Sequence, residues 1–379
     1  MPSPRPDRRV EIVTSAGRFA QLAPAWDRLA GDEPAPFVAH GWFAAWWEAF
    51  GGGDDELRVV AVWEGDELVA VAPLRRAGRR VVAMANEHTP LWRPLAADAD
   101  ARRRLLDAVL RLGGLLELAA VPAGDPVEAA LRARAAAAGA RVHRAAAHVS
   151  PLVDTSGDFA QWRALSRPRW GAPLERFRRK MGREHGAVIE AVVAPVDLAA
   201  ELRAGFEVEA SGWKGAAGTA ILSHPATTRF YEQVAAWAHA RGELRLSRVT
   251  LDGRMAAFDL TLLRGGRLYL LKTGFDERYR RLAPGLVLRL STIERCFELG
   301  LAAHELLGDD AEWKRKFATG ERRHVVLRAY GRRPVPRLAY GWRAGVRPVL
   351  RRGRDLARGA LAAARGRGDG TERPAPRGS

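Results

Sequence analysis

Hydrophobic and polar positions follow two periods along the chain, one typical of strands and one typical of helices. Residues 57–63 and 67–72 alternate about a Gly-Asp turn, which predicts a β-hairpin. Residues 244–250 and 254–263 repeat this pattern about an Asp-Gly turn. Each half of the sequence therefore contains one strong hairpin signal.

Other segments have apolar residues at helical spacing or in short runs. Helices are predicted at residues 19–29, 37–50, 101–112, 126–138, 159–165, 174–186, 196–211, 225–241, 286–299 and 310–317. Further strands are predicted at residues 10–14, 81–84, 115–119, 142–153, 188–193, 267–273, 304–307 and 324–330. Strands and helices thus alternate along most of the chain, which indicates an α/β protein.

The two halves have a similar order of elements, with helices, a hairpin, a helix and a final strand in each. This order suggests a duplicated α/β unit. We expect disorder over residues 1–9, one unit over 10–150, a second over 151–330 and a basic Arg-rich tail over 331–379. Because the first half lacks a loop like the one at 272–285, we expect it to have kept the fold and lost the cofactor site.

Composition narrows the class of protein. The chain has 379 residues, 47% of them hydrophobic, and no apolar run long enough to cross a bilayer. Its first residues lack the apolar core of a secretory signal, and its single cysteine, Cys296, excludes an internal disulfide or a cysteine-based zinc cluster. We therefore expect a cytoplasmic protein without a metal site.

The net charge of +17 is concentrated in the tail, which carries +10 and leaves +7 for the first 330 residues. No nucleic-acid-binding motif accompanies this charge, so we expect no specific nucleic-acid partner. Two interpretations of the tail stay open: a basic amphipathic helix on an anionic membrane surface, or a disordered segment. Only five of the 61 basic residues are lysines, and all five lie between residues 180 and 316. A lysine kept in so Arg-rich a chain suggests a position where arginine cannot substitute.

The stretch from 265 to 300 predicts the functional site. An apolar strand, a polar loop and a helix follow one another, and Ala283-Pro284-Gly285 opens the helix. The first backbone N–H groups of a helix lack partners and carry the positive end of its dipole. Gly285 permits close approach to the backbone, and Pro284 suits the first helical turn. We expect an anion, a pyrophosphate above all, to bind here.

The second half contains a set of short motifs: Ser211-Gly-Trp213-Lys214-Gly215, Ala256-Ala257-Phe258, Lys272-Thr-Gly274-Phe275-Asp276, Tyr279, Ala283-Pro284-Gly285, Leu307-Gly308-Asp309-Asp310 and Trp313-Lys314. Together these motifs resemble the GNAT acyltransferases of the CelD/BcsL type, which are linked to cellulose and exopolysaccharide synthesis. Trp42, Trp46 and Ala72-Pro73-Leu74 extend the resemblance into the first half, so that it covers roughly residues 10–330. The layout also looks like the tandem GNAT units of Fem-type aminoacyltransferases.

The resemblance implies a mixed, twisted sheet built from two tandem GNAT-like units, of which the N-terminal one is degenerate. It also implies acetyl-CoA or another acyl-CoA as the donor. The residues that would hold this donor are Arg281, Ala283, Pro284, Gly285 and Leu286. This loop has one glycine where the family usually has two or three.

Acyl transfer needs a base for the acceptor, polarisation of the carbonyl and protonation of the leaving thiolate. We name Glu209 and Asp276 as candidate bases, with Asp259 next, and Tyr279 as the proton donor. Trp213, Lys214 and Lys272 are the candidate substrate-binding residues. Four of these residues have a structural alternative. It is an ion pair with Lys214 or Arg203 for Glu209, the capping of a turn for Asp276, packing of the ring for Tyr279 and a place in the core for Trp213.

Three functions remain open. The first is an acyl-CoA-dependent N- or O-acyltransferase acting on a small molecule or glycan, such as a polysaccharide precursor or a cell-envelope metabolite. The second is a Fem-like aminoacyltransferase that uses aminoacyl-tRNA. The third is a non-catalytic component of polysaccharide synthesis.

Overall fold

The protein is described here from a computed structural model, which covers residues 7–166, 170–212, 215 and 217–331. The tail from 332 onward therefore lies outside the described residues, as do residues 1–6. Strand β1 begins at Arg8. Arg8 and Arg9, which we expected to be disordered, are thus part of the fold.

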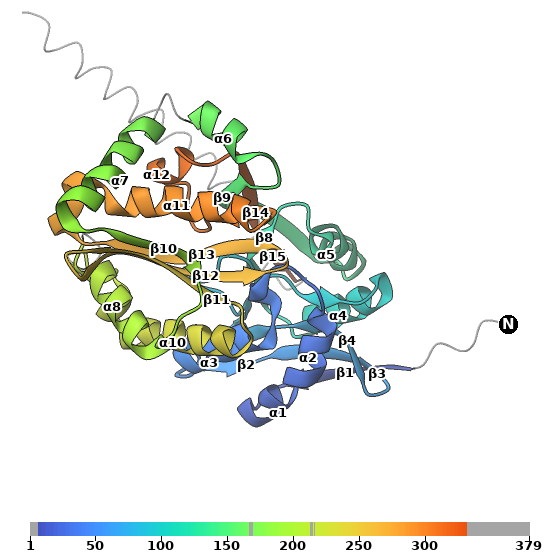
Figure 1. Cartoon of the computed structure of the whole chain (residues 1–379). Helices are drawn as coiled ribbons and strands as arrows, with labels where there is room; N and C mark the ends of the chain where they lie inside the picture. Colours follow the sequence, from blue (N-terminus) through green and yellow to red (C-terminus); the bar gives the residue numbers. More distant parts are fainter. Residues whose placement is uncertain (1–6, 167–169, 213–214, 216, 332–379) are drawn as a thin grey trace, which may run out of the picture.

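The first half begins with a strand and three helices and continues with short strands and two longer helices (Figure 1). Its elements are β1 (Arg8–Val13), α1 (Ala16–Gln21), α2 (Ala23–Ala30), η1 (Pro36–Val38), α3 (His40–Phe50), β2 (Asp55–Leu57), β3 (Val59–Glu64), β4 (Glu67–Ala72), β5 (Leu74–Ala77), β6 (Arg80–Ala83), β7 (Leu95–Ala96), α4 (Ala99–Arg111), β8 (Leu115–Pro122), α5 (Pro126–Ala137) and β9 (Arg141–Asp154).

The second half repeats much of this order with longer strands. Its elements are α6 (Phe159–Ser166), α7 (Ala172–His185), β10 (Val188–Val193), α8 (Leu198–Ala210), η3 (Ile221–Ser223), α10 (Pro225–Ala240), β11 (Leu244–Leu251), β12 (Arg254–Arg264), β13 (Arg267–Phe275), η4 (Glu277–Leu282), α11 (Pro284–Glu298), β14 (Ala303–Glu305), α12 (Glu312–Arg315) and β15 (Gly320–Tyr330).

Two four-stranded units correspond to each other. In the first half the order is β1-β3-β4-β7, and in the second half it is β10-β11-β12-β13, with antiparallel neighbours in both. The fourth strand differs most, since β7 has two residues and β13 has nine. The predicted duplication of an α/β unit agrees with this topology, and the predicted mixed α/β fold is confirmed.

The final strands of the two halves are exchanged. An 11-stranded sheet has the order β10-β11-β12-β13-β14-β9-β15-β8-β6-β5-β2. The last strand of the first half, β9, thus lies beside β14 of the second half, whereas β15 lies beside β8 of the first. β9 and β15 also pair with each other along most of their length. Neither half completes its sheet without a strand from the other.

Helices cover both faces of the second half's strands, with α7 and α11 on one side and α8 and α10 on the other (Figure 1). The two halves meet where α3 packs against α10. A Cβ atom at Gly41 would lie 2.0 Å from the indole nitrogen of Trp237, so glycine permits this close approach. Trp42 and Phe230 pack edge to face across the contact, with ring centroids 5.1 Å apart. Trp42 and Phe230 therefore belong to the core that joins the two halves.

Candidate active site

The first helix turn of α11 forms one end of the site. Ala283 precedes the helix in the left-handed conformation, with φ of 48°, and no described side chain caps the helix. Leu286 and Val287 both donate their amide N–H to the carbonyl of Ala283. Among the described residues, no group accepts from the amide of Gly285. This N-terminus therefore offers a backbone donor and the positive end of the dipole to an anion, as the sequence predicted.

A cavity of about 360 Å³ opens onto this helix end. Ala283, Gly285 and Leu286 form one wall, and Thr273 to Phe275 of β13 form another. A Cβ atom at Gly285 would lie 3.4 Å from the ring of Phe275, which is ordinary contact. We refer to this space as the first cavity.

The first cavity follows a gap in the sheet. β13 pairs with β14 only from Arg267 to Tyr269, so beyond Tyr269 the described part of β13 has a neighbouring strand on its β12 side alone. The register of β13 against β12 shifts where Leu271 is inserted as a bulge. A strand that parts from its neighbour in this way exposes backbone N–H groups to a ligand.

A second cavity of about 590 Å³ continues from the first, and Thr273 and Trp313 line both. Lys272 lines this second cavity, with its ammonium 4.9 Å from the ring centroid of Tyr231. The sequence predicted a strand that ends at residue 273, but β13 continues to Phe275. The two cavities thus run along one exposed edge of β13.

Glu209 is the predicted base that reaches the site. It is 2% exposed, lines the first cavity and accepts a 2.8 Å hydrogen bond from the amide of Ile221. A Cβ atom at Gly274 would lie 2.5 Å from the Cα of Glu209. Glycine at 274 therefore lets the end of α8 lie directly against β13, which brings Glu209 to the cavity.

The other two predicted catalytic residues have different surroundings. Both carboxylate oxygens of Asp276 bind the guanidinium of Arg278, and this pairing lowers the pKa of the carboxyl. Asp276 also caps η4 by accepting from the amide of Arg278. The hydroxyl of Tyr279 points to Asp252 at 3.5 Å, and its ring packs on His185. Neither Asp276 nor Tyr279 is among the residues lining the first or second cavity. These contacts fit the capping and packing alternatives, and a catalytic role for either residue stays a prediction.

The predicted donor-binding residues divide between the cavity and its surroundings. Ala283, Gly285 and Leu286 line the first cavity, and Pro284 is buried at the first helical position. Arg281 is exposed, and it is its neighbour Arg280 that lines the cavity. Two predicted substrate-binding residues, Trp213 and Lys214, lie outside the described residues.

Residues of the first half also reach the site, and the sequence did not predict them. His88 lines the second cavity from the loop between β6 and β7, and His148 lines it from β9. Burial, and after it the charge of Lys272, lowers the pKa of His88 to about 4. No spacing or motif around His88 marks it, because the exchange and packing of the halves bring it to β13.

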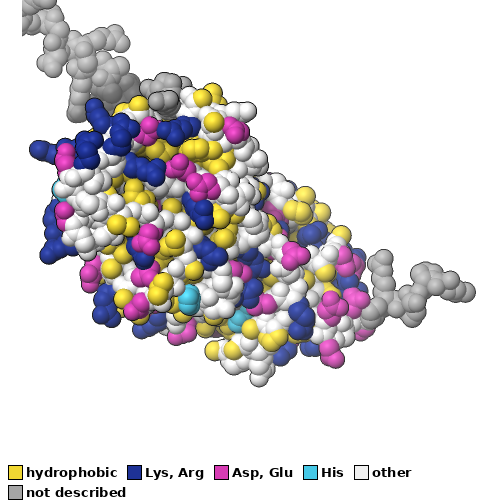
Figure 2. All heavy atoms as spheres, in the orientation of Figure 1, with side chains coloured by type: hydrophobic (Ala, Val, Ile, Leu, Met, Phe, Trp, Pro, Cys, Tyr) yellow, Lys and Arg dark blue, Asp and Glu magenta, His cyan; other side chains and the backbone are white. Residues whose placement is uncertain are grey.

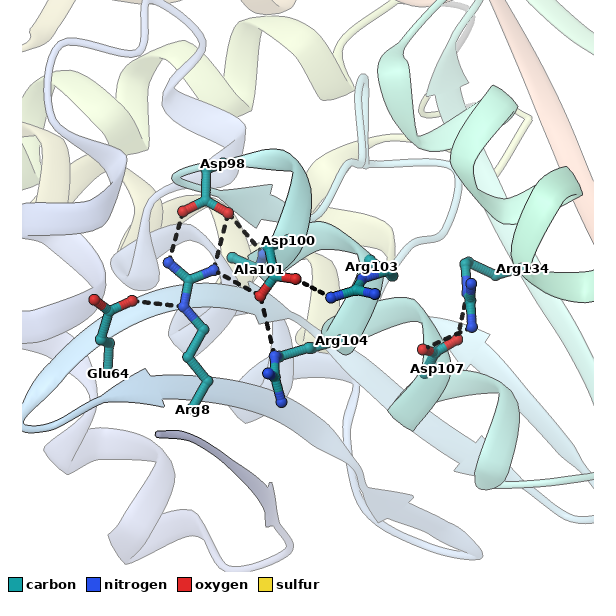
Figure 3. Close-up of polar contacts among 9 residues, drawn as sticks. All are labelled: Arg8, Glu64, Asp98, Asp100, Ala101, Arg103, Arg104, Asp107 and Arg134. Atoms are coloured by element: carbon teal, nitrogen blue, oxygen red, sulfur yellow. Dashed lines mark hydrogen bonds and ion pairs between the residues drawn. The ribbon is translucent and has the colours of Figure 1, made fainter. Parts of the chain in front are cut away.

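The corresponding helix of the first half, α4, has an occupied N-terminus (Figure 3). The carboxylate of Asp98 accepts from the amide of Ala101 at 2.8 Å. The same carboxylate pairs with Arg8 at 2.6 and 2.9 Å, and Arg8 also binds Glu64 and Asp100. The protein's own carboxylate thus fills the place that a bound anion would take at α11.

Basic side chains gather on the outer surface of α7, at the upper left of Figure 2. The exposed members are Arg176, Arg178, Arg179, Lys180 and Arg183. Arg178 pairs with Glu294 at 3.0 Å and Lys180 with Glu184 at 3.6 Å. Such pairs between exposed side chains are typical of a solvated basic face.

Across residues 7–331, apart from the gaps noted above, no helix is long and apolar enough to cross a membrane. In the same residues, no three histidine, cysteine or acidic side chains lie close enough together to hold a metal ion.

Comparison with known structures supports the fold. The C-terminal domain (DUF2156) described as part of a lysylphosphatidylglycerol synthetase from Agrobacterium fabrum is 14% identical, with a TM-score of 0.52, over 82% of this chain and 92% of that one. FemX is 11% identical, with a TM-score of 0.51, over 83% and 96%. A conserved protein from Bacteroides thetaiotaomicron is 9% identical, with a TM-score of 0.50, over 85% and 99%. At these identities the likeness shows a shared fold.

The sequence itself matches a family model over part of its length. The model of the acetyltransferase (GNAT) domain matches residues 172–315, which run from α7 to α12 and include the first cavity. No curated protein sequence matches the chain. Residues 172–315 therefore form an acetyltransferase (GNAT) domain, and the protein is a transferase of this type.

Proposed function

We propose that the chain transfers an acyl group from an acyl-CoA, acetyl-CoA above all, to an amine or hydroxyl of a small molecule or glycan. The observation that carries this proposal is the open N-terminus of α11 at a cavity beside a parted strand. The amide of Gly285 and the helix dipole would hold the pyrophosphate, and the pantetheine would extend along β13. Arg280 lines the same cavity and adds a positive charge.

The chemistry then needs little more than what the cavity supplies. A nitrogen or oxygen of the acceptor attacks the thioester carbon, and backbone N–H groups of β13 stabilise the oxyanion. Glu209 takes the acceptor's proton, directly or through a water molecule. The C–S bond breaks, and the thiolate takes a proton and leaves as CoA.

The resemblance to CelD/BcsL-type proteins favours a sugar, a polysaccharide precursor or another cell-envelope metabolite as acceptor. An acyl-CoA donor also implies work in the cytoplasm, where this donor is made. Contact with an anionic membrane surface through the basic tail stays a proposal of the sequence.

Titration calorimetry of acetyl-CoA with the wild type, Gly285→Asp and Gly285→Ala tests the donor site. The aspartate places a carboxylate where the pyrophosphate is expected, so we expect at least a hundredfold weaker binding. A Cβ atom alone fits at this position, so Gly285→Ala should bind within about threefold of the wild type. Equal binding by all three proteins would place the donor elsewhere, and no binding by the wild type would overturn the acyl-CoA proposal.

A Fem-like aminoacyltransferase is the second candidate. It draws on the fold shared with FemX over most of both chains and on the basic surface of α7. A dependence of acyl transfer on aminoacyl-tRNA, with no CoA release from acetyl-CoA, would decide for it. A non-catalytic role in polysaccharide synthesis is the third candidate, and full complementation of a deletion by a Lys272→Ala, Asp276→Ala variant would support it.

A further inference from the structure

The second cavity lies at the seam between the two halves. His88 and His148 line it from the first half, and Tyr231, Lys272 and Trp313 line it from the second. It lies beside the first cavity, with which it shares Thr273, on the strand that would carry the thioester. We propose that this second cavity binds the acceptor, that the acceptor is an uncharged molecule rich in hydroxyl groups, and that His88 selects it. This inference rests on the proposed function.

The charges of the cavity wall balance. Glu87 and Asp309 carry negative charge, and Lys272 and Lys314 carry positive charge. Lys314 donates from its ammonium to the backbone carbonyls of Leu307 and Asp309, so this ammonium is already hydrogen-bonded within the wall. A wall of zero net charge favours a ligand of zero net charge, because a buried unpaired charge is costly.

His88 orients a neutral hydrogen-bonding group, the hydroxyl of Tyr231, within this wall. Its side chain is 13% exposed, its Nδ1 lies 3.3 Å from the hydroxyl of Tyr231 and its Nε2 lies 3.4 Å from the hydroxyl of Thr227. Burial, and after it the charge of Glu209, raises the pKa of Tyr231, so the phenol keeps its proton. The imidazole is neutral at pH 7.

The two hydroxyls and the neutral imidazole form a hydrogen-bonded chain, and the direction of donation along this chain can reverse. Each hydroxyl donates or accepts, and the imidazole offers one N–H and one lone pair in either tautomer. Such a chain pairs with a ligand hydroxyl whichever way that hydroxyl points. It offers nothing to neutralise a phosphate or a carboxylate.

Two ring contacts hold the side chains of this hydrogen-bonded chain in place. The ring of His88 stacks on Phe50 at 5.5 Å between centroids, and the ammonium of Lys272 lies over the ring of Tyr231. Because Lys272 and Thr273 are adjacent on β13, a ligand against Tyr231 lies next to the junction of the cavities. A hydroxyl held there can reach a thioester in the first cavity.

The test compares two sugars that differ in charge. CoA release from acetyl-CoA is measured with methyl β-D-glucopyranoside and with glucose 6-phosphate as acceptors. We expect release with the neutral glucoside and at least about tenfold lower kcat/KM with the phosphate. Absence of release with the glucoside, or equal use of both sugars, overturns the inference.

Substitutions then test the role of His88. His88→Phe keeps a ring but removes both hydrogen bonds, so we expect the KM for the glucoside to rise at least about tenfold. The affinity for acetyl-CoA should not change, since His88 does not line the first cavity. His40→Phe is the matched control, because His40 is a buried histidine of the same half that lines neither cavity.

Two further measurements separate recognition from folding. His88→Gln, which keeps a donor and an acceptor, should restore the KM to within about threefold of the wild type. Thermal unfolding of each variant shows whether it is folded. An unchanged KM in folded His88→Phe would overturn the assignment of His88, whereas failure of the wild type to bind acetyl-CoA would instead overturn the proposed function.

Discussion

Two helices occupy corresponding places in the two halves, and their N-termini differ. α4 begins with Asp98, whose carboxylate caps the helix and binds Arg8 (Figure 3). α11 begins with Ala283 and Pro284, is capped by no described side chain and opens onto a cavity. One helix end is satisfied by the protein itself, and the other is left for a ligand. Under the proposed function, this difference favours a donor site in the second half.

The strands before these helices differ in the same sense. β7 has two residues and β13 has nine, of which the last six extend beyond the pairing with β14. Only the second half therefore has an exposed strand edge along which a pantetheine could lie. The first half has kept the helix and the hairpin but lacks this edge.

The halves nevertheless depend on each other. β9 and β15 exchange places in the 11-stranded sheet, and His88 of the first half reaches the exposed edge of β13. The first half thus supplies part of the wall of the second cavity. Under the proposed function, a unit without a donor site of its own completes the acceptor site of the other unit.

The pH dependence of stability should separate the buried histidines from the carboxylates at the N-terminus of α4. It is the largest effect that we expect. Burial lowers the pKa of His304 to about 3, of His88 to about 4 and of His324 to about 4. The folded state keeps these histidines neutral, whereas the unfolded chain takes up protons below pH 6.5. Stability is unaffected above pH 6.5 and falls as the pH drops toward 4, by about 1.4 kcal/mol per pH unit for each histidine.

The carboxylates of α4 should act at lower pH. Pairing with Arg8 and Arg104 lowers the pKa of Asp98 and Asp100, so their contribution is present above pH 3.8 and lost below it. Urea unfolding between pH 7 and 3 measures both ranges. Burial lowers the pKa of His40 and His148 as well, so we expect a slope of at least about 4 kcal/mol per pH unit around pH 5.5, and a slope smaller by about 1.4 kcal/mol per pH unit in His88→Phe. A flat profile between pH 6.5 and 4.5 would contradict the neutral state of these residues.

Removing the cation of the buried ion pair on α11 should lower the free energy of unfolding more than removing the cation of the ion-pair cluster at α4. Arg289 is 1% exposed, binds the carboxylate of Asp259 at 2.8 Å and donates to Nε2 of His304 at 2.7 Å. Arg289→Met leaves Asp259 buried without its cation, so we expect a loss of about 3–5 kcal/mol. Arg8→Met at the partly exposed cluster should lose about 1 kcal/mol or less. Urea unfolding at pH 7 compares the two variants, and equal losses would refute this distinction.

The elements that sequence alone predicted are those with local signals. Both hairpins follow from their Gly-Asp and Asp-Gly turns, and α11 begins at Pro284 as its Ala-Pro-Gly signal indicated. The short strands β2, β5 and β7 were not predicted, because two to four residues carry no periodicity. The exchange of β9 and β15 was not predicted either, since pairing between distant strands leaves no local pattern.

The sequence predicted those parts of the site that depend on the course of the backbone. The uncapped helix end beside Gly285 was predictable from the order of strand, loop and helix, and the predicted base Glu209 lines the first cavity. Asp276 and Tyr279 lie in the predicted segment, but side-chain direction in η4 depends on neighbours such as Arg278 and Asp252. His88 was missed because its place depends on how the halves pack.

The smallest effect that we expect tests whether α4 can be opened. Asp98→Gly removes the side-chain cap and one partner of Arg8, so we expect a loss of about 1 kcal/mol in urea unfolding. The variant exposes the α4 N-terminus but leaves β7 two residues long. Calorimetry with acetyl-CoA should therefore still show one site per chain, and Asp98→Gly combined with Gly285→Asp should show none. A second site in Asp98→Gly would mean that the cap alone, and not the missing strand edge, prevents the first half from binding acetyl-CoA.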